Sequence, residues 1–208
     1  QSRAIENALR RGGLPYQIIG GVRFYERKEI KDLLGYLKLV ANPDDDVNFR
    51  RVVNVPRRGI GQVTMDRIER EAAGRSLLDT ITDPETLDRF PRGQRDRVTI
   101  FAALMAKLRL VAARGTAHDV LDAAIEESGY IDHLMEDPKT AQIRQENVDE
   151  LRVETRRFAD ASENKSLSAF LEEIALFSDV DALRGEETVA LMTLHNSKGL
   201  EYRAILVT

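Results

Sequence analysis

Residues that could bind a nucleotide or a nucleic acid gather near the end of the chain, between two apolar runs. The runs Val189–Met192 and 204–207 have the composition of short buried strands. The segment between them carries Thr193, His195, Lys198, Gly199 and Glu201. The first two can donate to phosphate or sugar oxygens, the lysine and glycine can approach a triphosphate, and the glutamate can accept from a ribose hydroxyl. Because ligands bind at the carboxyl ends of strands in open α/β sheets, the whole segment indicates a ligand site, although each residue alone is more often structural.

A second group of candidate residues surrounds Gly59, Ile60 and Gly61, called the glycine turn below. The pattern resembles a helix-hairpin-helix element, in which glycines allow a close backbone approach. The N–H groups of such a turn and the start of the next helix can face a phosphate, and they would hold a duplex without reading its sequence. Arg57 and Arg58 would add charge, and Thr64 would add a hydroxyl. The alternative is an ordinary tight turn between helices with Ile60 in the core, and the sequence leaves both interpretations open.

The charge around the glycine turn is locally basic, although the whole chain has a net charge of −4. Residues 50–75 hold seven arginines against three acidic residues, a surplus of four positive charges. A surplus of this size is more typical of a solvated face than of a DNA-binding surface. Any binding to nucleic acid must therefore be local.

Two further segments carry alternatives. Residues 20–32 place Arg23, Arg27 and Lys28 beside two aromatic residues, which could line a path for single-stranded nucleic acid or lock a domain hinge. Residues 144–147, with Glu150, have the spacing of side chains that pair along one helix, so we expect a structural function there.

Several classes of function are excluded or disfavoured. The chain has no cysteine, and its three histidines lack metal-ligand spacing, so no metal site is expected and a cytoplasmic setting is favoured. No apolar run is long enough to span a membrane. No Gly-x-x-x-x-Gly-Lys-[Ser/Thr] sequence and no nucleophile elbow occur, so we expect no complete catalytic site.

The elements that must position these groups follow from periodicity. A helix is expected over 2–11 and a strand over 16–19. Further helices are expected over 30–40, 47–53, from 62, over 98–111, 117–126, 142–159 and 167–177, with ambiguous turns over 76–94 and an acidic connector over 179–187. An α/β start, a helical middle and an α/β finish indicate a helical domain inserted into a sheet domain, whose two flanks should meet. The first residue Gln1 and the final strand suggest a piece of a larger protein.

Five blocks of sequence occur in one order: residues 1–3, 20–32, 53–61, 144–147 and 192–201. Together they resemble the bacterial superfamily 1A DNA helicases of the UvrD/PcrA/Rep type, and the last block resembles helicase motif V. The resemblance implies a mainly α fold, in which a multi-helix domain 2B is inserted into a partial RecA-like α/β domain 2A, represented by short flanking strands. Residues 1–25 and 188–208 would belong to 2A, and residues 26–187 would form 2B.

The same resemblance implies functions for individual residues. It assigns Thr193 and His195 to single-stranded DNA and Glu201 to the nucleotide ribose, with Lys198 and Gly199 nearby. It assigns the glycine turn to duplex DNA, and Arg3 matches the family's Gln-Ser-Arg block. The DNA-binding prediction thus covers Arg3, Arg57, Arg58, Gly59, Ile60, Gly61, Thr64, Thr193 and His195.

The parent would be an ATP-dependent 3′-to-5′ helicase of DNA repair or replication that uses ATP and Mg²⁺. The fragment alone is expected to hydrolyse no ATP and to hold no cofactor, because the Walker motifs are absent from it. Its expected partners are single-stranded and duplex DNA and, through 2B, repair or replication proteins, in the bacterial cytoplasm with the nucleoid and without a membrane. The alternative function is a regulatory protein-interaction module whose DNA contact is incidental.

Overall fold

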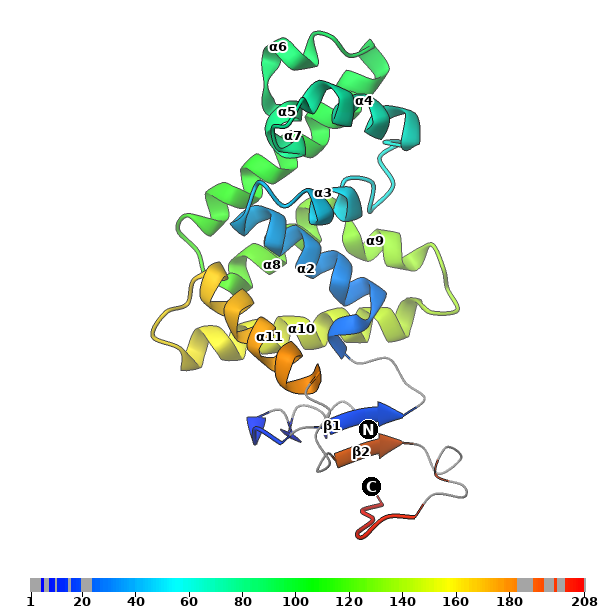
Figure 1. Cartoon of the computed structure of the whole chain (residues 1–208), viewed down its shortest axis with the longest axis vertical. Coiled ribbons are helices and arrows are strands. Elements are labelled where there is room, and N and C mark those ends of the chain that lie inside the picture. Colours follow the sequence, from blue (N-terminus) through cyan, green and yellow to red (C-terminus); the bar gives the residue numbers. More distant parts are fainter. Residues whose placement is uncertain are drawn as a thin grey trace. The chain divides into compact units, whose positions relative to one another are not determined.

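The structure, a computed structural model, is mainly helical, as the sequence predicts (Figure 1). It describes residues 5, 8–9, 11–14, 16–19, 24–182, 189–192, 197 and 201–207. The longer helices are α2 (Lys28–Ala41), α4 (Gln62–Ala72), α7 (Arg92–Ala112), α8 (Ala117–Ser128), α10 (Ala141–Ala161) and α11 (Leu167–Ala182). The short ones are η1 (Phe24–Glu26), α3 (Asp46–Val52), α5 (Leu77–Thr82), α6 (Pro84–Leu87) and α9 (Tyr130–Met135).

The two flanks of the chain meet as a pair of strands. Strand β1 (Tyr16–Ile19) pairs in parallel with β2 (Val189–Met192), and Tyr16 lies opposite Val189 in the register. The expectation that the flanks meet is therefore confirmed. The chain divides into one compact unit of residues 1–27 and 172–208, which holds this strand pair, and a second compact unit, Lys28–Leu171, which holds most of the helices.

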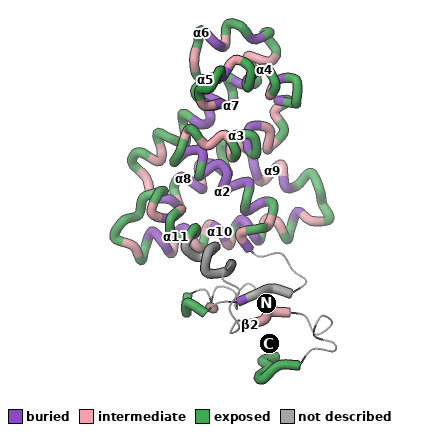
Figure 2. Tube along the Cα trace, in the orientation of Figure 1, coloured by how far each residue is buried: buried purple, intermediate pink, exposed green. Residues whose placement is uncertain are grey.

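Helix α2 is the centre of the helical unit, as Figure 2 shows by its run of buried residues. The predicted apolar positions Ile30, Leu33 and Leu37 are fully buried. The opposite face of α2 is buried as well, including Tyr36 and Leu39, because α3, α7, α8 and α10 all contact it. Only a stripe with Lys28, Lys31 and Lys38 stays exposed, so α2 also buries polar groups, and these need partners.

Buried polar side chains of α2 are joined to three other helices. The Asn147 amide of α10 donates to the Glu29 carboxylate. Arg51 of α3 lies 3.0 Å from one Asp32 oxygen, and the Tyr130 hydroxyl of α9 donates to the other over 3.2 Å. Burial and the nearby Asp32 carboxylate raise the pKa of Tyr130 above its usual range. These contacts fix how α3, α9 and α10 lie on α2.

Helices α2 and α3 lie close together at Gly35. A Cβ added to Gly35 would lie 2.8 Å from a Val52 methyl group and 3.0 Å from the Arg51 side chain. Only glycine at this position lets α3 lie so near α2. Because α3 leads directly into the loop of residues 53–61, this packing sets where the glycine turn begins (Figure 1).

Some elements differ from those predicted. The apolar run 204–207, predicted to be a short buried strand, forms no strand, and its residues are exposed. Residues 76–94, left ambiguous by the sequence, form α5, α6 and the start of α7, with Ser76 and Asp83 capping the first two helices. Helix α11 reaches Ala182, so the predicted connector over 179–187 is wrong for its first residues. Residues 167–184 contain no glycine or proline, and acidic residues alone do not end a helix. The Ser166 hydroxyl accepts from the Ala169 amide over 3.3 Å and caps the start of α11.

Gly35→Ala is expected to lower the free energy of unfolding by about 1 kcal/mol or more, since the clash with α3 outweighs the gain in helix propensity. Urea denaturation measures the change. Gly93→Ala in α7 is the matched control, because a Cβ there would meet nothing within 4 Å. Equal effects of the two substitutions would contradict the account of the α2–α3 contact.

Candidate nucleic-acid interface

The glycine turn has the backbone geometry of a tight connection between α3 and α4. Gly59 has a φ of 71°, in the left-handed region that favours glycine. Its carbonyl accepts from Arg97 Nη1 of α7 over 2.9 Å. Gly61 is the N-cap of α4 with an extended backbone, and its carbonyl accepts from the amides of Thr64 and Met65. The turn is thus held from α7 and leads straight into α4.

Asn54 organises the loop from within. Its side-chain oxygen accepts from the Arg58 amide over 2.8 Å and from the Ile60 amide over 3.2 Å. The Ile60 side chain is only 2% exposed, so it fills the core below the turn. The sequence left two interpretations of this turn open. The buried Ile60 agrees with a tight turn that packs into the core. The backbone N–H groups beside Ile60 could still face a phosphate.

Arg58 points inward rather than towards solvent. Its Nη1 donates to the carbonyls of Val52, Val53 and Pro56, at 3.2 to 3.3 Å. Its Nη2 donates to the Tyr36 hydroxyl over 2.6 Å, and the guanidinium carbon lies 5.3 Å from the centre of the Phe101 ring. The Val52 carbonyl also accepts from the Val55 amide, whereas Arg58 gives the Val53 and Pro56 carbonyls a donor that the irregular loop does not supply. Arg58 therefore has a structural function here, and the DNA contact predicted for it stays a prediction.

Tyr36 lies directly beneath Arg58. Its side chain is buried, and its hydroxyl donates to the Val55 carbonyl while it accepts from Arg58. Burial raises the pKa of Tyr36 to about 12, against the opposing effect of the Arg58 charge. The hydroxyl therefore stays protonated at neutral pH and joins α2 to the loop. We call Tyr36, Asn54 and Arg58 the loop clamp.

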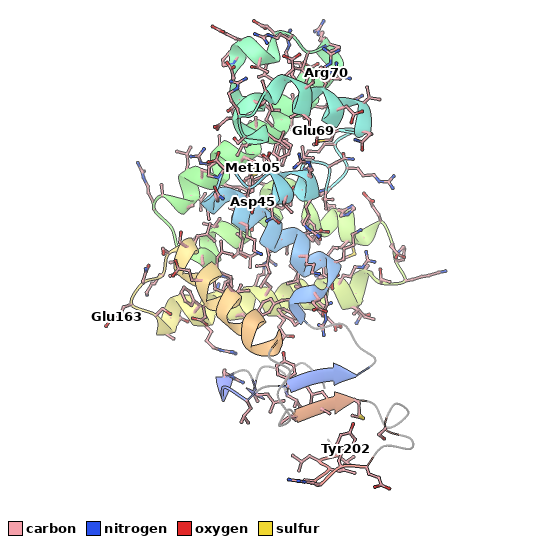
Figure 3. All side chains as sticks on the ribbon, in the orientation of Figure 1. Asp45, Glu69, Arg70, Met105, Glu163 and Tyr202 are labelled. Carbon is pink, nitrogen blue, oxygen red and sulfur yellow. The ribbon has the colours of Figure 1, made fainter. Side chains whose placement is uncertain are left out.

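Most of the basic surplus is paired within the helical unit. Arg50 lies 2.8 Å from Glu69, Arg51 pairs with Asp32, Arg67 donates to the Arg89 carbonyl, and Arg75 lies 3.0 Å from Asp83. Hydrogen bonds from Thr86 and Arg75 lower the pKa of Asp83. In the part of the chain that the structure describes, Arg57 and Arg70 are exposed and have no such partner; Figure 3 labels Arg70 on α4.

The start of α4 presents backbone donors. The first amides of an α-helix have no acceptor within the helix, and Gly61 supplies no side-chain cap. Gln62 and Val63 are exposed there, whereas Thr64 is only 4% exposed. An uncapped helix start beside Arg57 favours an anion, because the helix dipole and the N–H groups act in the same direction. The hydroxyl contribution predicted for Thr64 has little access to solvent.

The structure brings together only part of the predicted site. Residues Arg3, Thr193, His195, Lys198 and Gly199 lie outside the described residues. Glu201 is described and exposed. The structure tests neither the nucleotide contact nor the single-strand contact, so both stay predictions.

The two segments with alternatives have structural contacts. Phe24 is buried, with the Tyr25 ring 5.1 Å away and the Arg27 guanidinium 5.4 Å from its centre, which fits packing. Arg23 lies outside the described residues, and the single-strand path stays a prediction. Pairing along α10 occurs between Gln142 and Glu146, whose side chains lie 3.3 Å apart. Asn147 also donates to Glu29, which lies 118 positions away on another helix. Pairing along one helix does not predict such a contact between helices.

Sequence reasoning missed three residues that shape the turn. Asn54 carries a detectable signal, because asparagine side chains commonly accept from backbone amides in turns. Tyr36 and Arg97 carry none. They lie 22 positions from Arg58 and 38 positions from Gly59, so only the fold joins them to the loop.

Two other kinds of site find no support in the described part of the chain. No three histidine, aspartate or glutamate side chains gather there as a metal site would require. None of its helices combines the length and apolar character needed to cross a membrane.

A family comparison agrees with the order of the sequence blocks. The model of the UvrD-like helicase C-terminal domain matches residues 1–208. The chain belongs to the UvrD-like helicase family. The match includes both the strand pair and the inserted helices, so the family accounts for the whole chain.

Individual members of the helicase family are similar to this chain over its whole length. It is 37% identical to the ATP-dependent DNA helicase PcrA of Bacillus subtilis over 217 residues. It is 30% identical to the PcrA of Staphylococcus aureus strain Mu50 and 31% identical to that of Staphylococcus epidermidis, each over 212 residues. In each case all of this chain is covered, and it spans 29% of the relative's length.

Tyr36→Phe is expected to lower the free energy of unfolding by about 1–2 kcal/mol, since it removes a buried hydroxyl that both donates and accepts. Urea denaturation gives the change. Tyr202→Phe is the control, because that hydroxyl is exposed and its contact within the described residues is with the Met192 sulfur at 3.7 Å. If the two variants lost equal stability, the loop clamp would not hold the turn as described.

Proposed function

We propose that the chain is the part of an ATP-dependent 3′-to-5′ DNA helicase that holds duplex DNA through the glycine turn. The observation that carries the proposal is the family match over residues 1–208, together with relatives named as ATP-dependent DNA helicases. Since the chain spans 29% of the length of those relatives, unwinding, ATP hydrolysis and the use of Mg²⁺ are proposed for the whole protein.

The duplex contact is proposed for the backbone at the turn and for Arg57. The left-handed Gly59 and the uncapped start of α4 expose amides that suit phosphate oxygens. Arg57 is an exposed cation beside them. In this proposal Ile60, Thr64 and Arg58 shape the turn from inside. Contacts of this kind hold the DNA backbone without sequence preference, as a helicase requires.

The remaining part of the site is proposed for the unit that contains the strand pair. Arg3, Thr193 and His195 would contact single-stranded DNA, and Glu201, with Lys198 and Gly199, would contact the nucleotide. Glu201 would accept a hydrogen bond from the ribose. Residues 1–25 and 188–208 would belong to domain 2A and residues 26–187 to domain 2B.

A function in DNA repair or replication, in the bacterial cytoplasm with the nucleoid, is part of the same proposal. The rival is a regulatory module that binds repair or replication proteins through the helical domain, with incidental DNA contact. The two functions differ in one measurable property, which is salt-dependent duplex binding that depends on the glycine turn.

Arg57→Gln is expected to weaken binding to a short blunt duplex, measured by fluorescence anisotropy over a series of salt concentrations. The slope of log K against log salt should fall in magnitude by about 0.9, the value for one lost phosphate contact. Arg57 is the better choice than Arg58, because changing Arg58 would also disturb the loop.

Arg70→Gln is the matched control. Arg70 is also exposed, but it lies in the last turn of α4, about 12 Å along the helix from its start. If the salt slope of the Arg57→Gln variant equalled that of the unmodified chain, Arg57 at the glycine turn would not contact the duplex. No duplex binding by the unmodified chain would favour the protein-interaction function.

A further inference from the structure

We infer that Arg97 of α7 is a second phosphate-binding residue of the glycine turn. The inference rests on the proposed duplex contact and adds a residue that lies outside the family blocks of the sequence. Arg97 is exposed, and its guanidinium lies against Gly59. It is thus a cation that the fold, not the chain order, brings to the turn.

The position of Arg97 is fixed by the backbone of the turn. Its Nη1 donates to the Gly59 carbonyl over 2.9 Å. Three of its atoms, Nε, Cδ and Cζ, lie 3.2 to 3.3 Å from the point where a Cβ on Gly59 would sit. The absence of a side chain at Gly59 therefore serves two purposes, since it permits the positive φ and leaves room for the guanidinium.

Among the residues that the structure describes, the Gly59 carbonyl is the one hydrogen-bond acceptor of Arg97. A guanidinium has five N–H donors in a fixed fork, and the Gly59 carbonyl uses one of them. Within the described residues Arg97 forms no ion pair, unlike Arg50 or Arg75. Asp66, the acidic residue on the first two turns of α4, accepts from Gln62 over 2.7 Å. An oriented guanidinium with free donors suits a phosphate, which it can bind with two hydrogen bonds.

Because Arg58 points inward, the positive charge at the surface of the glycine turn must come from other residues. Four acceptors surround the Arg58 guanidinium, so that residue contributes little charge at the surface of the turn. The exposed charge beside the glycine turn then comes from Arg57, next to it in sequence, and from Arg97, brought by α7. Two cations on separate elements can fix the orientation of a duplex better than one.

Arg97→Gln tests this inference in the 208-residue chain with a short blunt duplex. Glutamine is a good helix former, and its amide can still donate to the Gly59 carbonyl, so the turn should keep its shape. The slope of log K against log salt should nevertheless fall by about 0.9, with weaker binding to every duplex sequence. Arg97→Lys keeps the charge and should retain the slope.

Arg109→Gln is the matched control, because Arg109 is exposed on the same helix about 18 Å from Arg97. Its slope should equal that of the unmodified chain, and circular dichroism should show equal helix content in all variants. If Arg97→Gln also kept the unmodified slope while Arg57→Gln lowered it, the assignment of Arg97 alone would be overturned. No duplex binding by the unmodified chain would overturn both this assignment and the proposed function.

Discussion

The inward guanidinium of Arg58 is the interaction on which the glycine turn depends. A loop without regular secondary structure leaves carbonyls without partners in a helix or sheet. One arginine donates to those of Val53 and Pro56, and also to that of Val52 at the end of α3. The same group donates to the Tyr36 hydroxyl on the central helix, so the loop is anchored to the most buried element of the helical unit. A turn anchored in this way can present backbone amides at low entropic cost, because little order has to be gained when a ligand binds.

Most helices and strands can be predicted from the sequence, because apolar residues recur at helical spacing or occur in short runs. The spacing of Ile30, Leu33 and Leu37 predicts α2, and short apolar runs at both ends of the chain predict the strands that pair as β1 and β2. The direction of single side chains was not predictable. Arg57 and Arg58 are adjacent and identical in type, yet one is exposed and the other turned inward, since the deciding partners are carbonyls and a tyrosine that only the fold brings near.

The contact between Arg97 and the glycine turn could not be predicted from the sequence either. Arg97 lies 38 positions from Gly59, immediately before the apolar helix predicted over 98–111, and nothing in the sequence there indicates a contact with the turn. By contrast, the glycines themselves are visible in the sequence, and so is the order of blocks that matches the UvrD-like family. The glycines that a turn needs are found in the local sequence, whereas tertiary contacts decide which charged side chains lie beside the turn. The surplus of arginines over residues 50–75 is therefore weak evidence for a DNA-binding surface, since most of those arginines pair with acids or carbonyls of the same unit.

The most direct test of the central claim is an NMR titration of the chain, labelled with ¹⁵N at glycine, with a short DNA duplex. The thirteen glycines give a simple spectrum, in which each amide reports on its own surroundings. The account predicts that the signals of Gly59 and Gly61 shift as duplex is added, while those of Gly35, Gly115 and Gly129 stay in place. Shifts confined to other glycines, or binding without any shift at Gly59 and Gly61, would contradict it.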